Sequence, residues 1–110
     1  MPSQYVFIES RDPFESTDTG FVADTARALR ARGRPVTVFL VQNGVLATRA
    51  AARGSQVGRL VESGVTVLAD DFSLQERGIA ACELSAGVRQ ASIEDLVDLV
   101  VQPHTKTLWH

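Results

Sequence analysis

Short apolar, β-branched runs alternate along the chain with longer segments of helical periodicity. The apolar runs cover residues 5–8, 36–41, 65–69, 88–91 and 105–109. Several of them are continuously apolar rather than alternating with polar residues, which is typical of strands that are covered on both faces. The pattern therefore predicts five short strands.

Between these runs, apolar residues recur at helical spacing and are bounded by residues that start or stop helices. The main helices are predicted over residues 20–32, 45–53, 56–62 and 92–101. Ser92 is the expected N-cap of the last one, with Asp95 at its third position. Residues 70–72 predict a turn, and Ser73 to Glu76 has the Ser-x-x-Glu spacing of a capping box that starts a further short helix. Residues 79–84 predict one or two more helical turns.

The alternating order of strands and helices predicts the fold class. It favours a mainly parallel sheet of about five strands with helices on both faces, which is a three-layer α/β/α sandwich. No linker or low-complexity tract divides residues 1–110, so we expect a single domain. Ligands of such sheets bind beyond the carboxyl ends of the strands, which directs attention to residues 9–19, 42–45 and 70–73.

Two of these loops carry polar residues suited to binding. Asn43 and Gly44 follow the second strand, and Asp70 and Asp71 follow the third. Asn-Gly is first of all a turn signal, although its backbone amides can face a ligand. The aspartates can bind a cation, share a proton or cap the helix that follows them. We predict a pocket formed by Asn43, Gly44, Asp70 and Asp71.

Cys82 is the single cysteine, so the chain cannot form an internal disulfide. It lies between alanines and Glu83, where a free cysteine is commonly packed as a small apolar side chain. A cation or a helix N-terminus nearby would instead make it a thiolate nucleophile or sulfur carrier.

Composition and charge exclude several classes of function. With 45% hydrophobic and 22% charged residues the chain is neither disordered nor collagen-like, and its net charge of −2 gives no basic surface for nucleic acid. No apolar stretch is long enough for a membrane span, and the N-terminus lacks the pattern of a secretory signal, so we expect a cytoplasmic protein. The sequence has no phosphate-binding or dinucleotide motif. His104 and His110 both lie in the tail of the chain, whereas metal sites need ligands that rigid elements hold in place. We expect no cofactor and no metal.

The sequence resembles the DsrE/DsrF-like family, which includes the TusBCD sulfur-relay subunits and the YchN-type proteins. The resemblance covers nearly the whole chain and rests on the order and spacing of residues 5–8, 38–45, 64–69, 73–79 and 93–97. It implies an α/β/α sandwich that assembles as a homotrimer or a hexamer, with a sulfur-relay protein as a partner. An inter-subunit pocket would then be lined by Asn43, Asp70 and Asp71.

One departure from the family bears on function. Counted back from Arg77 and Gly78, the position of the family's sulfur-carrying cysteine is occupied by Asp70. A carboxylate cannot carry a persulfide, so the resemblance implies a non-transferring member with a structural, regulatory or ligand-binding role. Two alternatives remain: a persulfide carrier that uses Cys82, and a small hydrolase or isomerase that uses Asp70 or Asp71 as a general base.

The end of the chain is unusually apolar. Leu108 and Trp109 stand close to the terminus, and Phe39 and Phe72 add apolar surface near the ends of predicted elements. Such a pair is expected to be held either by the sheet or by a neighbouring subunit.

Overall fold

The sheet has five strands in the part of the chain that the structure, a computed structural model, describes, namely residues 3–49 and 56–110. Every neighbouring pair is parallel, and the strand order is β4-β3-β2-β1-β5. This arrangement confirms the predicted parallel sheet. The strands are β1 (Gln4–Glu9), β2 (Val36–Leu40), β3 (Thr66–Asp70), β4 (Val88–Ala91) and β5 (Thr105–Trp109).

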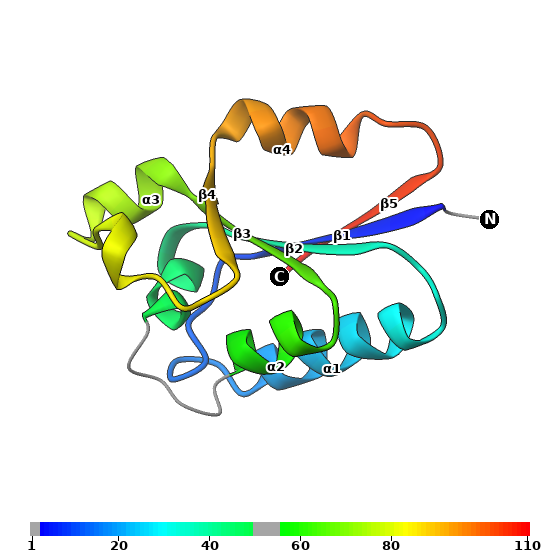
Figure 1. Ribbon diagram of the computed structural model, residues 1–110, viewed down its shortest axis with the longest axis horizontal. Helices are drawn as coiled ribbons and strands as arrows, with labels where there is room; N and C mark the ends of the chain where they lie inside the picture. The colour runs from blue at the N-terminus through cyan, green and yellow to red at the C-terminus, as the bar shows by residue number, and fades with distance from the viewer. Residues whose placement is uncertain (1–2, 50–55) are drawn as a thin grey trace.

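Helices cover both faces of the sheet, as Figure 1 shows. Helices α1 and α2 lie below the sheet in that view, and α4 lies above it. The predicted three-layer sandwich is therefore confirmed. The helical segments are α1 (Asp18–Ala31), α2 (Gln56–Glu62), α3 (Asp71–Glu76) and α4 (Ile93–Val100), with 3₁₀ turns η1 (Gln42–Thr48) and η2 (Ala81–Glu83).

Strand residues of alternate orientation build two separate cores. Phe7 and Val38 point toward α1 and α2, where they pack with Ala26 and Leu60. Val6, Ile8 and Phe39 point the other way and pack against Leu96 of α4. This division follows from the period of two in a strand, and it explains why β2 is buried at every position.

The predicted start of the last helix is confirmed in atomic detail. The Ser92 hydroxyl accepts a hydrogen bond from the Asp95 amide at 3.2 Å, and the Asp95 carboxylate accepts one from the Ser92 amide at 2.9 Å. Each side chain satisfies a backbone N–H group that the first turn of a helix leaves without an internal partner.

The helix predicted over residues 45–53 is not formed as such. The chain makes the 3₁₀ turn η1 instead and becomes extended at Arg49, which pairs with Leu84 in an isolated antiparallel bridge. Ser85 fixes this ending, because its amide and hydroxyl both donate to the Thr48 carbonyl, at 2.7 and 2.9 Å. Tertiary hydrogen bonds thus override the helix propensity of the alanines. Residues 50–53 lie outside the described residues.

The turn predicted at residues 70–72 and the capping box predicted at Ser73 are both wrong. Strand β3 continues through Asp70, and α3 begins at Asp71 without an intervening turn. Asp70 is the N-cap, and its carboxylate accepts from the Ser73 amide at 3.0 Å. Of the roles expected for the aspartates, helix capping is thus the one that Asp70 performs, and α3 begins earlier than the capping box at Ser73 predicts.

The strand order places β1 between β2 and β5. The chain leaves the carboxyl end of β1 for α1 on one face of the sheet, and it reaches the amino end of β5 from α4 on the opposite face. In open α/β sheets ligands bind beyond the carboxyl ends of the strands, which here include the end of β1.

Candidate functional site

Glu9 and His110 lie together at the carboxyl ends of β1 and β5. Glu9 is the last residue of β1 and only 5% exposed, and Nδ1 of His110 lies 2.9 and 2.7 Å from its two carboxylate oxygens. The backbone holds the pair in register, since the His110 amide donates to Ile8 and the Ser10 amide donates to His110, both at 2.8 Å. The close contact is thus an extension of the β1–β5 strand pairing.

The surroundings of Glu9 disfavour its charged form. Burial raises the pKa of the Glu9 carboxyl above its ordinary value of 4.5. The hydrogen bond and positive charge of His110 act in the opposite direction, as do the backbone N–H groups of Ser10 and Arg11, but burial prevails. Carboxyl groups whose pKa is shifted by burial and by a specific charged partner are often found at functional sites.

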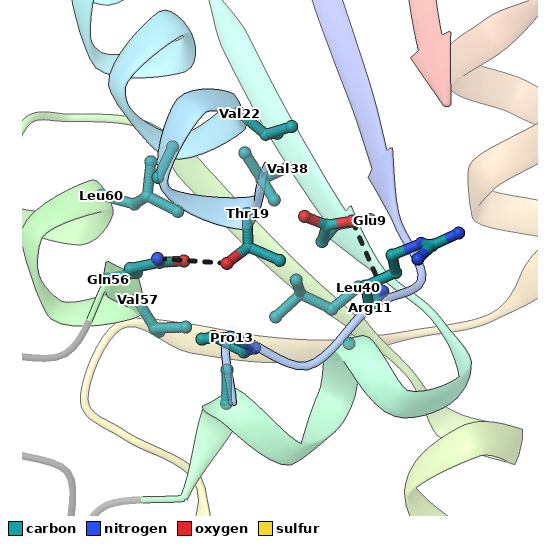
Figure 2. Close-up of a pocket in the computed structure, with 13 residues that line it drawn as sticks. Glu9, Arg11, Pro13, Thr19, Val22, Val38, Leu40, Gln56, Val57 and Leu60 are labelled. Atoms are coloured by element: carbon teal, nitrogen blue, oxygen red, sulfur yellow. Dashed lines mark hydrogen bonds between the residues drawn. The ribbon is translucent and has the colours of Figure 1, made fainter. Parts of the chain in front are cut away.

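A small cavity opens beside the Glu9 carboxylate (Figure 2). Its volume is about 20 Å³ when measured by the space open to the centre of a water molecule, which is enough for one water-sized group. The polar lining residues are Glu9, Arg11, Thr19 and Gln56. Apolar walls come from α1, β2 and α2, and include Val22, Val38, Leu40, Val57 and Leu60.

Gly44 allows the cavity to close around the end of β1. A Cβ atom at this position would collide with the carbonyl oxygen of Glu9. The same carbonyl accepts a hydrogen bond from the Val41 amide at 3.0 Å, so neither segment is free to withdraw. Only glycine lets η1 pass this close to the end of β1.

The other predicted residues belong to a separate polar network at the ends of β2 and β3. Arg77 donates through Nε and Nη2 to Oδ1 of Asn43, at 3.1 and 3.0 Å, and through Nη1 to the Ser73 carbonyl at 3.3 Å. The Ser73 hydroxyl donates to Asp70 at 2.6 Å and accepts from the Gln42 amide at 2.8 Å. The network therefore connects Asn43 with Asp70 through Arg77 and Ser73.

The four residues predicted to form one pocket therefore have different surroundings. Gly44 lines the cavity beside Glu9, whereas Asp71 is exposed at a shallow hollow next to α3. Asp70 is buried and accepts hydrogen bonds from within its own helix start. Cys82 is exposed in η2.

Sequence reasoning singled out neither Glu9 nor the acid–imidazole pair. The available signal was a charged residue directly after an apolar strand, inside the loop that the strand rule had indicated. The sequence presents His110 only as a candidate metal ligand, because its proximity to Glu9 depends on the pairing of the first strand with the last.

Across residues 3–49 and 56–110, no three His, Cys, Asp or Glu side chains gather into a group able to hold a metal ion. No helix in the same described ranges is long and apolar enough to span a membrane.

Taken together, the parallel five-stranded sheet, its strand order and its helical layers define a small α/β protein of the YchN-like fold. The chain is similar in structure to YchN from E. coli, with a TM-score of 0.80, 21% identity and coverage of 97% of this chain and 99% of that one. It is equally similar to a protein of unknown function, MTH1491, from Methanobacterium thermoautotrophicum, with a TM-score of 0.81, 21% identity and coverage of 97% and 98%.

A third similar structure is BT1422 from Bacteroides thetaiotaomicron, also described as a protein of unknown function. Its TM-score is 0.70 and its identity 18%, over 97% of this chain and 95% of that one. No family model matches the sequence, and no curated protein matches it significantly. At these identities the likeness establishes the fold and leaves activity to be argued from the site.

Proposed function

We propose that this chain is a non-transferring, small-ligand-binding domain of DsrE-like type, which works as a homo-oligomer beside a sulfur-handling partner protein. Three features support the proposal. The fold is that of the YchN-type proteins, the carboxylate at Asp70 replaces the expected sulfur carrier, and a small cavity lies beside Glu9 at the carboxyl end of β1.

The state of Asp70 is the observation that carries the proposal. Its Oδ2 accepts from both the amide and the hydroxyl of Ser73, at 3.0 and 2.6 Å, and the residue is buried. The side chain therefore serves to start α3 and to hold the Gln42 amide through Ser73. A carboxylate in this position has no sulfur to transfer, and its hydrogen bonds direct it into the protein rather than toward a substrate.

The decisive experiment is intact-mass measurement of the reduced protein after incubation with a persulfide donor. We expect no gain of a sulfur atom in the wild type, and the same result in Cys82→Ser, which serves as the matched control. A gain of one sulfur in the wild type that disappears in Cys82→Ser would overturn the proposal.

That outcome would establish the second candidate function, a persulfide carrier that uses Cys82. The observation in favour of it is the exposure of Cys82, because a carrier thiol must be accessible. A carrier also needs an activated thiolate, so iodoacetamide would alkylate Cys82 faster than a free cysteine at neutral pH. Alkylation at the rate of a free thiol contradicts this alternative.

Exposed apolar side chains support the oligomer. At the β5 edge Trp109 is 65% exposed, Leu108 38%, and the neighbouring Phe21 of α1 73%. On α4, Ile93 and Val97 are also exposed at a spacing of four residues, which places them on one flank of the helix. Apolar groups gathered at an uncovered sheet edge are typical of surfaces that meet a partner.

Light scattering coupled to size exclusion tests the assembly. We expect a mass of three or six times the 11.9 kDa of one chain at micromolar concentration. A mass of one chain under these conditions contradicts the oligomeric part of the proposal.

A further inference from the structure

We propose that helix α4 of one copy of this chain packs into the hollow between α1 and β5 of a second copy. This inference rests on the proposed function, because it gives the homo-oligomer its contact surfaces. Both surfaces are exposed in the single chain, and they are complementary in polarity and in charge.

Helix α4 presents a row of uncovered apolar side chains. Ile93, Val97 and Val101 follow one another at a spacing of four residues, and between 51% and 69% of each is exposed. Glu94 and Asp98 form an acidic row directly beside them, and both are exposed as well. A partner for this surface must therefore offer apolar groups together with positive charge.

The hollow between α1 and β5 supplies the apolar groups. It is lined by Phe21 and Val22 of α1 and by Leu108 and Trp109 of β5. Its volume is about 210 Å³ when measured by the space open to the centre of a water molecule. One water needs only about 10–15 Å³ on this measure, so the hollow has room for the side chains of a helix.

Positive charge lies further along the same side of the sheet. Leu108 pairs with Phe7, whose side chain faces α1, and Lys106 faces the same way because it lies two residues earlier on β5. Helix α1 runs antiparallel to the strands, since it connects the parallel strands β1 and β2. Arg32, which ends α1, therefore lies at the same end of the sheet as Lys106.

The charges on the two surfaces have no partners of their own. Across residues 3–49 and 56–110, the ion pairs involve none of Arg32, Lys106, Glu94 and Asp98. Antiparallel packing of α4 on α1 of a second copy places Val101 at the apolar end of the hollow and Glu94 beside Arg32. Packing of two α4 helices on each other would instead bring carboxylates of both copies together, which is unfavourable.

The contact between copies is head-to-tail, because α1 and α4 cover opposite faces of the sheet (Figure 1). One neighbour receives α4 of a given copy, and a different neighbour places its own α4 in the hollow of that copy. Such contacts close into a ring when the rotation between neighbours allows it. A ring of three copies has the trimeric mass expected from the proposed function.

A charge exchange tests the predicted pairing of Glu94 with Arg32. Arg32→Glu places like charges in contact and is expected to weaken assembly by about tenfold, as measured by sedimentation equilibrium. Adding Glu94→Arg should restore the dissociation constant to within about threefold of the wild type. The matched control adds Glu76→Arg instead, which restores the net charge at an exposed position of α3 outside the contact. Unchanged assembly in Arg32→Glu, or equal recovery with Glu76→Arg, would overturn the proposal.

A second experiment tests whether the contact is head-to-tail. Val97→Asp places a charge in the α4 row, and Phe21→Asp places one in the hollow. Both residues are exposed, so circular dichroism should show an unchanged fold. Each variant alone should have a smaller mass than the wild type in sedimentation velocity. A mixture should associate again, because α4 of the Phe21→Asp chain fits the intact hollow of the Val97→Asp chain. A mixture that stays as small as the separate variants contradicts the proposal.

Failure of this inference can be separated from failure of the proposed function. If the wild type assembles and Val97→Asp and Phe21→Asp assemble equally well, only the contact surfaces are wrong. A wild type with the mass of one chain contradicts the oligomeric part of the proposed function as well.

Discussion

Glu9 and His110 are 101 positions apart in the chain, and yet Nδ1 of His110 lies 2.7 Å from a carboxylate oxygen of Glu9. Parallel pairing of β1 with β5 brings the two residues together at the same edge of the sheet. The contact therefore joins the carboxyl ends of the first and last strands. It is both an anchor for the end of the chain and one wall of the candidate site.

The raised pKa of Glu9 predicts how stability depends on pH. A carboxyl whose pKa is higher in the folded than in the unfolded protein binds its proton more tightly when folded, so its contribution to stability is fully present below the unfolded value of 4.5. This contribution to stability is lost as the pH rises through the raised pKa of Glu9 in the folded protein. We expect the unfolding free energy of the wild type to fall relative to that of Glu9→Gln as the pH rises from about 4.5. Urea titrations of both proteins across the acid-to-neutral range measure this difference. A difference that grows in favour of the wild type toward neutral pH would contradict the assignment.

The close approach of Gly44 to the end of β1 predicts that any side chain at this position lowers the stability of the fold. Gly44→Ala places a methyl group against the Glu9 carbonyl, and backbone on both sides is held by hydrogen bonds. We expect a loss of about 1–3 kcal/mol in unfolding free energy, as is typical of overpacking. Gly20→Ala is the matched control, because a Cβ there meets only Gln56 Nε2 at 3.7 Å, within the helix α1. Chemical denaturation measures both variants, and equal midpoints would refute the close approach.

The hydrogen bonds of Asp70 lead us to expect that Asp70 contributes more to stability than its neighbour Asp71. Asp70→Ala removes the N-cap of α3 and leaves the Ser73 amide and hydroxyl without their acceptor. We expect a loss of about 1–2 kcal/mol, the usual effect of removing an N-cap. Asp71→Ala removes an exposed carboxylate from the same helical turn and should change stability by no more than about 0.5 kcal/mol. Thermal unfolding of the two variants compares them, and similar effects would show that the cap contributes little.

Much of the fold could be predicted from the sequence, because each strand and helix carries its own local signal. The strand at residues 88–91, the helix at 56–62 and the Ser92 cap were all predicted at the positions observed. The errors arise where distant contacts decide the structure. Hydrogen bonds from Ser85 end the turn η1 near Thr48, and no pattern within residues 45–53 indicates them.

The candidate site was harder to predict for the same reason. The sequence rule identified the correct edge of the sheet, but which loop residues meet depends on strand order. Placing β5 beside β1 brings His110 to Glu9, whereas the resemblance directed attention to Asp70, which lies beyond β2 at the end of β3. Side-chain pairing between remote segments has no local periodicity, so it becomes visible only when the register is known.

Trp109 is the only tryptophan in the chain, so its fluorescence can report assembly. Its side chain stands on β5 with 65% of its surface exposed in the single chain, although the backbone of the strand is paired with β1. If the β5 edge meets a second copy, assembly removes this indole from water, and its fluorescence should shift to shorter wavelength as concentration rises. Trp109→Ser is expected to reduce the assembled mass by weakening an apolar contact at the interface. Phe14→Ser is the matched control, since Phe14 is 97% exposed in the loop that follows β1. An unchanged assembled mass in Trp109→Ser, or an equal loss in Phe14→Ser, would place the interface elsewhere on the molecule.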